Sequence, residues 1–312
     1  MNRFLALAAL LLAAPAFAAA LAPAPALDAG FAAVKRALQA VRPAAFSDGN
    51  TEDQLLSLLD DWDQNVRAAA AKALREYAAS DPKVSARLAE IMENGTDNPL
   101  VRKEAIKSLS IAASRSDDLR RRIIAVAQQG MNPDEVREIA CKALYSTLSP
   151  GSAADDSRDA LLAILAENNE RPAVRAGAAW GLFPDAATSR TQDALLAAAN
   201  DQWLDAGARA EAVKSLYFVL DASPSVRDSL RSLADEGLTA FPTRFAAVVV
   251  FQRVNADPAV GEWLQGLARD ASPVQIRTAA ILAQTQGVTE DLARYFHFTR
   301  LGGRALDPLA DE

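Results

Sequence analysis

Few side chains in this sequence could act together in catalysis. The one histidine, His297, lies in the aromatic stretch Tyr295-Phe296-His297-Phe298, where we interpret it as a packing or surface residue rather than a general base. The one cysteine, Cys141, cannot form a disulfide within the chain. Zinc sites of the usual type need several Cys or His ligands. The sequence therefore predicts no catalytic, cofactor-binding or metal site, and we expect that the protein is not an enzyme.

Two acidic clusters and a glycine pair are candidate ligand sites. Asp60-Asp61-Trp62-Asp63 has the oxygen ligands that a hard cation prefers. Acidic residues also cap helices, and we interpret this cluster, together with Asp155-Asp156, as turns that precede helices. Gly302-Gly303 follows no predicted strand and has no lysine of a phosphate-binding loop after it, so we interpret it as a turn in the tail.

The charge balance argues against a nucleic-acid partner. The chain of 312 residues carries 33 basic and 40 acidic residues, which gives a net charge of −7, and half of its residues are apolar. Nucleic-acid binding depends on clustered Lys and Arg that neutralise phosphates. The composition instead predicts a folded chain with a large core.

The main feature is a repeat that aligns on one arginine. The arginines are spaced by 35, 35, 38, 34, 35 and 33 positions and are Arg67, Arg102, Arg137, Arg175, Arg209, Arg244 and Arg277. Alanine lies three positions after each of them, at Ala70, Ala105, Ala140, Ala178, Ala212, Ala247 and Ala280. The residue four positions after is small or apolar, and Cys141 holds this place in the third copy. We therefore expect Cys141 to be a buried and inert core residue.

The spacing of these positions predicts helices. Offsets −1, +3, +4 and +7 from the arginine share one side of an α-helix, which would be the buried stripe. A fixed alanine at its centre indicates that a neighbouring helix crosses closely there. Asp81-Pro82, Ser223-Pro224 and Asp257-Pro258 are typical starts of a preceding helix in the same copy. Each copy is thus predicted to be a pair of helices, and the arginine lies on the second.

Val66 to Leu74 and its copies resemble the second helix of short bacterial-type HEAT repeats. The resemblance implies an all-α fold, a right-handed α-solenoid of about seven helix pairs over residues 51–287. It also implies that second helices line a concave wall. HEAT families often pair the arginine with an Asp before the same helix. Asp61 and Asp97 suit this role, but the third, fourth and sixth copies lack an equivalent Asp, so we do not expect a continuous ladder.

The two ends of the chain are predicted to have separate roles. Residues 1–18 have a basic start, an apolar run broken by Pro15 and the small-x-small motif Ala16-Phe17-Ala18, which is the layout of a signal peptide. We expect cleavage after Ala18, or alternatively after Ala20, and a periplasmic or secreted protein without a membrane anchor. Residues 19–50 are predicted to be a linker and an N-terminal capping helix, and residues 288–312 a C-terminal capping segment and tail.

A candidate binding face follows from the offsets +5 and +8, which lie away from the buried stripe. Its residues are lysines and aromatics: Lys107, Lys142, Tyr145, Trp180, Phe183, Lys214 and Tyr217. We expect them to be accessible on the concave wall and to bind an apolar segment that carries acidic groups, although packing between repeats was equally open. On the first interpretation, changing Trp180 and Tyr217 to alanine abolishes binding without unfolding the chain. The remaining candidates are the outer helices and the tail at Tyr295 to Phe298.

The sequence thus favours an exported, non-enzymatic scaffold that binds a protein or peptide. The first alternative is an enzyme or ligand-handling protein on a HEAT scaffold, similar to bilin lyases. The second is a nucleic-acid protein similar to HEAT-like DNA glycosylases, which the acidic charge and the signal-like start oppose. The His-Glu pairs of iron-binding HEAT-repeat hydroxylases are absent.

Overall fold

The repeats of the sequence form fourteen helices in two series. A computed structural model describes residues 51–148, 155–296, 300–301, 304–305 and 309. The first helix of each pair belongs to the series α4 (Thr51–Leu58), α7 (Pro82–Glu93), α9 (Asp117–Gln128), α11 (Asp155–Ala166), α13 (Ser189–Asn200), α15 (Pro224–Asp235) and α17 (Pro258–Asp270). The second helices are α5 (Gln64–Ala73), α8 (Pro99–Ala113), α10 (Asp134–Ala143), α12 (Pro172–Gly181), α14 (Ala206–Ser215), α16 (Phe241–Val249) and α18 (Val274–Ala283).

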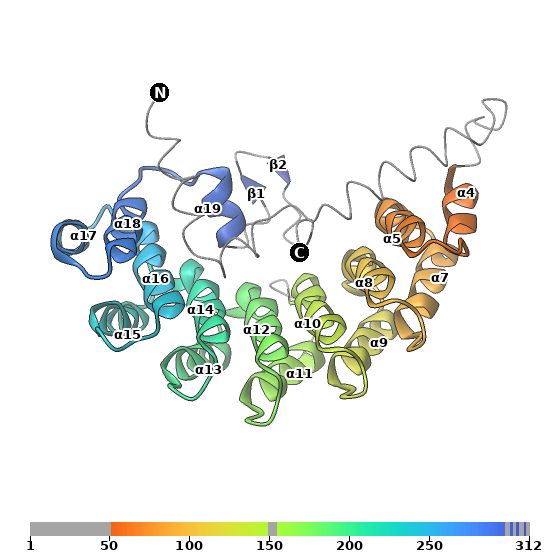
Figure 1. Ribbon diagram of the computed structural model, residues 1–312, viewed down its shortest axis with the longest axis horizontal. Coiled ribbons are helices and arrows are strands. Elements are labelled where there is room, and N and C mark those ends of the chain that lie inside the picture. The colour runs from red at the N-terminus through yellow and green to blue at the C-terminus, as the bar shows by residue number, and fades with distance from the viewer. Residues whose placement is uncertain (1–50, 149–154, 297–299, 302–303, 306–308, 310–312) are drawn as a thin grey trace.

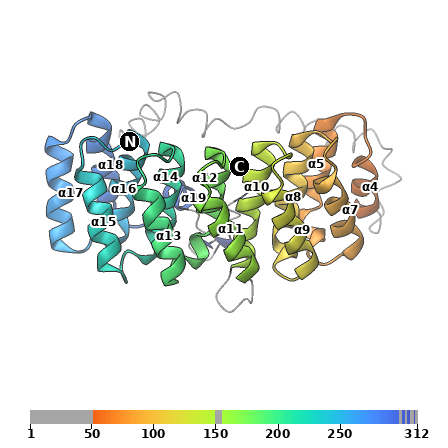
Figure 2. The ribbon, with the colours of Figure 1, turned by 90° about the horizontal axis from the view of Figure 1, so that it is seen from below.

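The helix pairs stack into an arc (Figure 1). Second helices line its inner side and first helices its outer side, and Figure 2 shows the pairs standing side by side in a row. The predicted all-α solenoid of seven pairs is therefore confirmed. The signal peptide, the linker and the predicted helix before residue 51 lie outside the described residues, as do His297, Gly302 and Gly303.

Short elements follow the second helices or close the described chain. They are α6 (Arg75–Ala78), the 3₁₀ helices η2 (Leu144–Thr147), η3 (Phe183–Asp185), η4 (Tyr217–Val219) and η5 (Val250–Val254), α19 (Glu290–Tyr295), β1 (Arg300–Leu301) and β2 (Arg304–Ala305). The strands β1 and β2 pair antiparallel, with Arg300 opposite Ala305. The sequence pattern predicts no strand there. None of the helices in the described part is long and apolar enough to cross a membrane.

Polar residues before proline begin several first helices, as predicted. The side chain of Asp81 accepts hydrogen bonds from the backbone N–H groups of Lys83 and Val84, and Asp257 accepts one from Ala259. Ser223 holds the same position without a side-chain cap. These bonds satisfy N–H groups that the first turn of a helix leaves unpaired.

The alanine column lies where consecutive second helices cross. All seven alanines at offset +3 are 0% exposed. The helices α10 and α12 approach each other closely where Gly177 and Gly181 face the backbone of α10. A Cβ atom at Gly181 would lie 2.5 Å from the carbonyl oxygen of Cys141, and one at Gly177 would lie 2.7 Å from that of Glu138. This crossing therefore requires residues without a side chain.

The repeated arginine caps the first helix of its own pair. In five consecutive repeats its Nε donates to a carbonyl ten residues earlier, at distances of 2.8–3.0 Å. These acceptors are Met92, Ala127, Leu165, Ala199 and Ala234. Carbonyls in the last turn of a helix have no partner within it, so the arginine satisfies a group that would otherwise be buried unpaired.

Several of the repeated arginines also reach the next repeat. Arg67 pairs with Asp97 at 2.7 Å, and Arg137 pairs with Glu170. Within its own repeat, Arg67 donates to the backbone carbonyls of Asp61 at 2.8 Å and Trp62 at 3.4 Å, and not to the Asp61 carboxylate. The expected pairing of an arginine with an Asp of its own repeat is therefore wrong for Asp61 and Asp97. These ion pairs join consecutive repeats, and Glu170 pairs with the arginine in a repeat that has no Asp at this place.

Candidate partner-binding face

Three of the predicted aromatic residues meet on the inner side of the third and fourth repeats. Tyr145 in η2 lies edge-on to Trp180 in α12, with ring centroids 5.5 Å apart. Phe183 in η3 lies edge-on to Trp180 at 5.4 Å and stacks near Tyr145 at 5.8 Å. The alignment of the internal repeats therefore predicts correctly that these three residues lie together.

Tyr217 joins this group through Phe218, which lies outside the predicted binding face. Phe218 lies 5.9 Å from Phe183 and 5.3 Å from Tyr217, measured between ring centroids. The hydroxyl of Tyr217 donates to Oε1 of Gln252 in the next repeat at 2.6 Å. We call Tyr145, Trp180, Phe183, Tyr217 and Phe218 the aromatic wall.

The expected exposure of these aromatic residues is wrong. Trp180 and Tyr217 are each 1% exposed, and Tyr145 and Phe183 are also buried. The α-helical period fails at offset +8 because the second helices end before it, and the chain continues as the 3₁₀ turns η2, η3 and η4. Removing Trp180 and Tyr217 together would therefore remove core packing, contrary to the expectation of an intact fold.

The lysines are paired instead of forming an open positive column. Each makes an ion pair with a glutamate one turn earlier on its own helix: Lys107 with Glu104 at 2.8 Å, Lys142 with Glu138 at 3.0 Å, and Lys214 with Glu211 at 2.5 Å. Lys107 and Lys142 are buried, which corrects the expectation that they are accessible. Because a glutamate accompanies each lysine, this part of the wall attracts an acidic segment less than the lysines alone would.

The C-terminal segment packs against the aromatic wall. Phe296, which is 0% exposed, stacks on Tyr217 with ring centroids 4.0 Å apart and planes inclined by 17°. Tyr295 lies 6.5 Å from Phe245 of α16, and the ammonium group of Lys214 lies 4.9 Å from the Tyr295 ring. Figure 1 shows α19 inside the arc. The segment expected as a terminal cap thus lies on the inner side of the arc.

Burial governs the titratable groups of this region. Desolvation raises the pKa of the Tyr145 and Tyr217 hydroxyls above its ordinary value, with a smaller opposing effect from Arg75 and Arg253 respectively. Cys141 is 0% exposed, and desolvation raises the pKa of its thiol as well. A thiol held protonated in this way is a poor nucleophile, in agreement with the prediction that Cys141 is an inert core residue.

The acidic clusters act as caps and ion-pair partners. Asp63 accepts a hydrogen bond from the N–H of Asn65 at 2.8 Å, and Asp61 accepts one from the N–H of Asp63 at 2.8 Å. Asp155 and Asp156 lie in the first turn of α11 and pair with Arg158 and Arg120. Across the described ranges, no group of three Asp, Glu, His or Cys residues is arranged to hold a metal ion.

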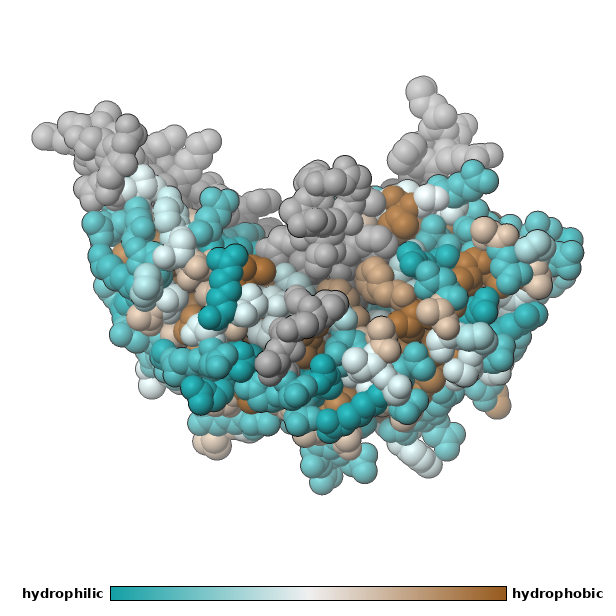
Figure 3. All heavy atoms as spheres, turned by 180° about the vertical axis from the view of Figure 1, so that it is seen from behind, coloured by the Kyte–Doolittle hydropathy of each residue, from teal (hydrophilic) through white to brown (hydrophobic). Residues whose placement is uncertain are grey.

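Four large apolar side chains are almost fully exposed in the turns between first and second helices. They are Trp62, Met131, Trp203 and Leu238, with exposed fractions of 88–95%. Met131, Trp203 and Leu238 occupy the same place, two residues before the N-cap of the second helix. The side of the molecule in Figure 3 is mostly hydrophilic, with separated apolar spots. These turns provide matched surface positions for testing the inner wall.

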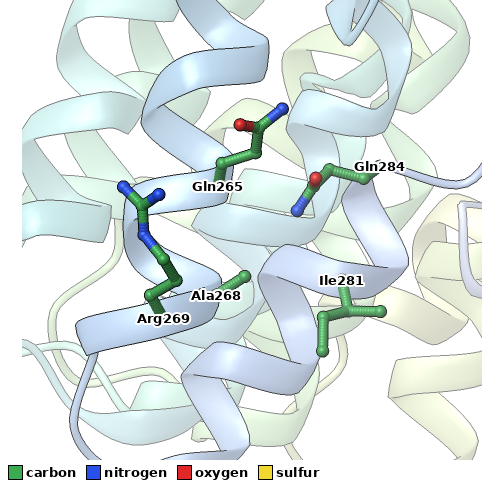
Figure 4. A pocket seen from close by; sticks show the side chains of 5 residues that line it. All are labelled: Gln265, Ala268, Arg269, Ile281 and Gln284. Atoms are coloured by element: carbon green, nitrogen blue, oxygen red, sulfur yellow. The ribbon is translucent and has the colours of Figure 1, made fainter.

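An open depression of about 320 Å³ lies between α17 and α18 in the last pair (Figure 4). Its lining is Gln265, Ala268, Arg269, Ile281 and Gln284. Ile281 holds the offset of Cys141 but is 56% exposed, because no further helix pair within the described residues stacks against α18. The depression is thus the uncovered side of the terminal repeat.

The fold is an all-α solenoid, and a repeated arginine joins several of its stacked helix pairs. A family profile described as HEAT repeats matches residues 21–110 and 52–144. Over these residues the chain is similar to the HEAT-repeat family.

The solved structures that the chain is similar to have low sequence identity. The complex of CpcE and CpcF of phycocyanin lyase from Nostoc sp. PCC7120 is 15% identical over 82% of this chain and 96% of that chain, with a TM-score of 0.45. Human deoxyhypusine hydroxylase is 16% identical over 83% and 95%, with a TM-score of 0.35. A mutant of Kap121p is 15% identical over 85% and 31%, with a TM-score of 0.48. No curated protein matches the sequence significantly.

Proposed function

We propose that this protein is a non-enzymatic HEAT-repeat scaffold that binds a segment of a protein or peptide partner. The binding surface would be the inner wall, by which we mean the side of the arc that the second helices line. The observation that carries the proposal is the packing of Phe296 on Tyr217. It is a contact between a short peptide segment and the wall through aromatic rings. Aromatic side chains supply large contact areas at a low entropic cost and dominate binding hot spots.

The chemistry of the wall supports an apolar, aromatic segment as the ligand. Phe218, Phe241 and Phe245 add three partly buried aromatic side chains to this region. Lys107 and Lys214 are accompanied by Glu104 and Glu211, which reduces the attraction for acidic groups. We therefore revise the proposed ligand from an acidic apolar segment to an aromatic one.

The proposal includes export. It rests on the signal-like pattern at residues 1–18, and the exported chain would begin at Ala19 or Leu21. N-terminal sequencing of the protein recovered from a cell-envelope fraction tests this part. An N-terminus at Met1 in that fraction would contradict it.

The experiment on function compares two pairs of variants as bait in an envelope extract. Phe218→Ala and Phe245→Ala change partly buried rings on the inner side, whereas Trp62→Ala and Trp203→Ala change exposed rings in the turns. We expect one protein to be enriched by the unmodified chain and by both turn variants, and to be lost with the inner variants. Circular dichroism verifies that all four variants keep their helices.

The opposite pattern would place the binding surface on the turns and contradict the proposal. A chromophore that copurifies with the chain, seen in its absorption spectrum, would favour the alternative of a ligand-handling protein similar to bilin lyases.

A further inference from the structure

The end of the aromatic wall at Tyr217 is covered by the chain itself, and the residues that cover it indicate what the site binds. We propose that the wall beside α14 and α16 is a socket for two adjacent aromatic side chains, and that Tyr295-Phe296 is its built-in ligand. A partner segment with the same Tyr-Phe type of pair would then compete with the C-terminal segment for the socket. This inference rests on the proposed function, because it specifies the ligand of the same wall.

Phe296 occupies the deeper position of the socket. Its ring stacks on Tyr217 at 4.0 Å and is completely buried. Tyr217 is itself held in place, since its hydroxyl donates to Gln252 at 2.6 Å and the Arg253 guanidinium lies 5.9 Å from its ring. The platform under Phe296 is therefore fixed by side chains of the repeat that follows α14, which favours tight stacking.

Tyr295 occupies the second position. It is perpendicular to Phe296, with ring centroids 5.0 Å apart, and edge-on to Phe245 at 6.5 Å. The Lys214 ammonium group lies 4.9 Å from the centre of the Tyr295 ring, within the range of a cation–π interaction. Glu211 holds this ammonium group by an ion pair at 2.5 Å. The socket thus contacts both rings of the pair through different groups.

The segment joins the solenoid through a short connection that the socket also contacts. Gly287 has φ of +80°, a conformation that favours glycine, and lies in the exposed connection between α18 and α19. Nε2 of Gln252 donates to the carbonyl of Gly287 at 3.0 Å, while Oε1 accepts from Tyr217. One glutamine side chain therefore bonds both the platform and the start of the C-terminal segment.

Several features make the segment replaceable. The helix α19 has only six residues, and a helix of this length has little stability of its own. Glu290, Asp291 and Arg294 on it are exposed. Its advantage over an external ligand is that it is tethered, which gives it an effective concentration in the millimolar range. An external aromatic pair must overcome that advantage, so the tethered segment lowers the apparent affinity of the wall.

A labelled peptide tests the socket directly. The probe is a fluorescein-labelled peptide with the sequence of residues 288–296, and the protein is the full chain with or without Tyr295→Ala and Phe296→Ala. We expect the double variant to bind the probe at least about tenfold more tightly than the unmodified chain, because its own segment no longer competes. A probe in which both aromatic residues are alanine should bind neither chain. Equal binding of both probes, or equal affinity of both chains, would overturn the proposal.

Hydrogen exchange of the unmodified chain gives a second test that needs no variant. The amides of Ala293 and Phe296 are hydrogen-bonded within the C-terminal segment, to Thr289 and Leu292. Excess probe should release the segment and accelerate exchange of these two amides, while amides of α14 stay protected. Unchanged exchange at a saturating probe concentration would show that the segment is a fixed part of the fold and would refute the competition.

The two proposals fail in different ways. Loss of partner capture in Phe218→Ala and Phe245→Ala, together with no binding of the probe, would keep the inner wall as the binding surface and reject Tyr-Phe as its ligand. Probe binding to the double variant without any partner capture would keep the socket and leave the C-terminal segment of this chain, from the same or a second copy, as its occupant. Light scattering of the double variant with the unmodified chain would then detect exchange between copies.

Discussion

The guanidinium of Arg102 donates from Nη2 to Oδ1 of Asn132 at 2.7 Å and so joins the second repeat to the turn of the third. Both side chains are buried. The amide nitrogen of Asn132 in turn donates to the carbonyl of Val126 at 3.1 Å, which fixes the turn. Arg102 therefore stabilises its own pair and the boundary with the next one, and the energy of that boundary decides whether neighbouring repeats unfold together.

Arg137→Ala should destabilise the solenoid by about 3 kcal/mol, because it leaves Glu170 without its buried partner and the carbonyl of Ala127 without a donor. Arg190→Ala is the control, since the pair that Arg190 forms with Asp159 is largely exposed, and its cost should be within about 0.5 kcal/mol. Denaturant unfolding followed by circular dichroism measures both. Equal midpoints for the two variants would contradict the role of the arginine between repeats.

Ala140→Leu should destabilise the protein by about 1–3 kcal/mol, because the alanine is 0% exposed where two second helices cross. Ala125→Leu makes the same change on the exposed side of α9 and should shift stability by less than about 0.5 kcal/mol. A thermal melt that is the same for both leucine variants would show that the assigned helix face is wrong.

Gly181→Ala should lower stability even though alanine is the better helix former. The new methyl group would lie 2.5 Å from the carbonyl oxygen of Cys141, so α10 and α12 would have to separate. Gly266→Ala, inside α17, has no atom within 4 Å of the new methyl group and should raise stability by about 0.5–1 kcal/mol. Opposite shifts of the two melting temperatures are the expected result, and shifts of the same sign would be evidence against the close crossing.

Acid should remove stability that the carboxylate of Asp185 contributes. Burial acts to raise the pKa of Asp185, but hydrogen bonds from Arg158, Thr191 and Thr188 and the charge of Arg158 outweigh it, so the pKa lies below its ordinary value. The contribution is complete above the unfolded-state pKa and is lost as the pH falls through the folded-state pKa. Asp185→Asn should therefore melt lower than the unmodified chain near neutral pH and show a smaller further loss on acidification. Parallel melting curves across the acid range would contradict this assignment.

The sequence predicts the solenoid well because its evidence is repeated. Arg102, Arg137 and their equivalents fix the register of every second helix, and the alanine three positions later marks the crossing. The prediction that Tyr145 and Tyr217 are accessible is wrong, because a helical wheel assumes an α-helix where the chain has already entered a 3₁₀ turn.

Contacts between distant residues were not predictable from a periodic pattern. Phe296 reaches Tyr217 only because the arc brings the end of the chain back to its inner side. The glutamates beside Lys107 and Lys214 were visible in the sequence, three positions before each lysine, and attention to pairs at this spacing would have corrected the predicted charge of the wall.

The uncovered side of α18 has a consequence for how such a chain changes in length. Ile281 and Val274 are more than half exposed there, with exposed fractions of 56% and 52%. In the third copy the residue equivalent to Ile281 is Cys141, which the following pair covers completely. An eighth pair appended after Gln284 would therefore meet a surface that already has the register of the earlier junctions. The number of repeats is thus a property that duplication or design can extend, because the described residues leave this side of α18 open.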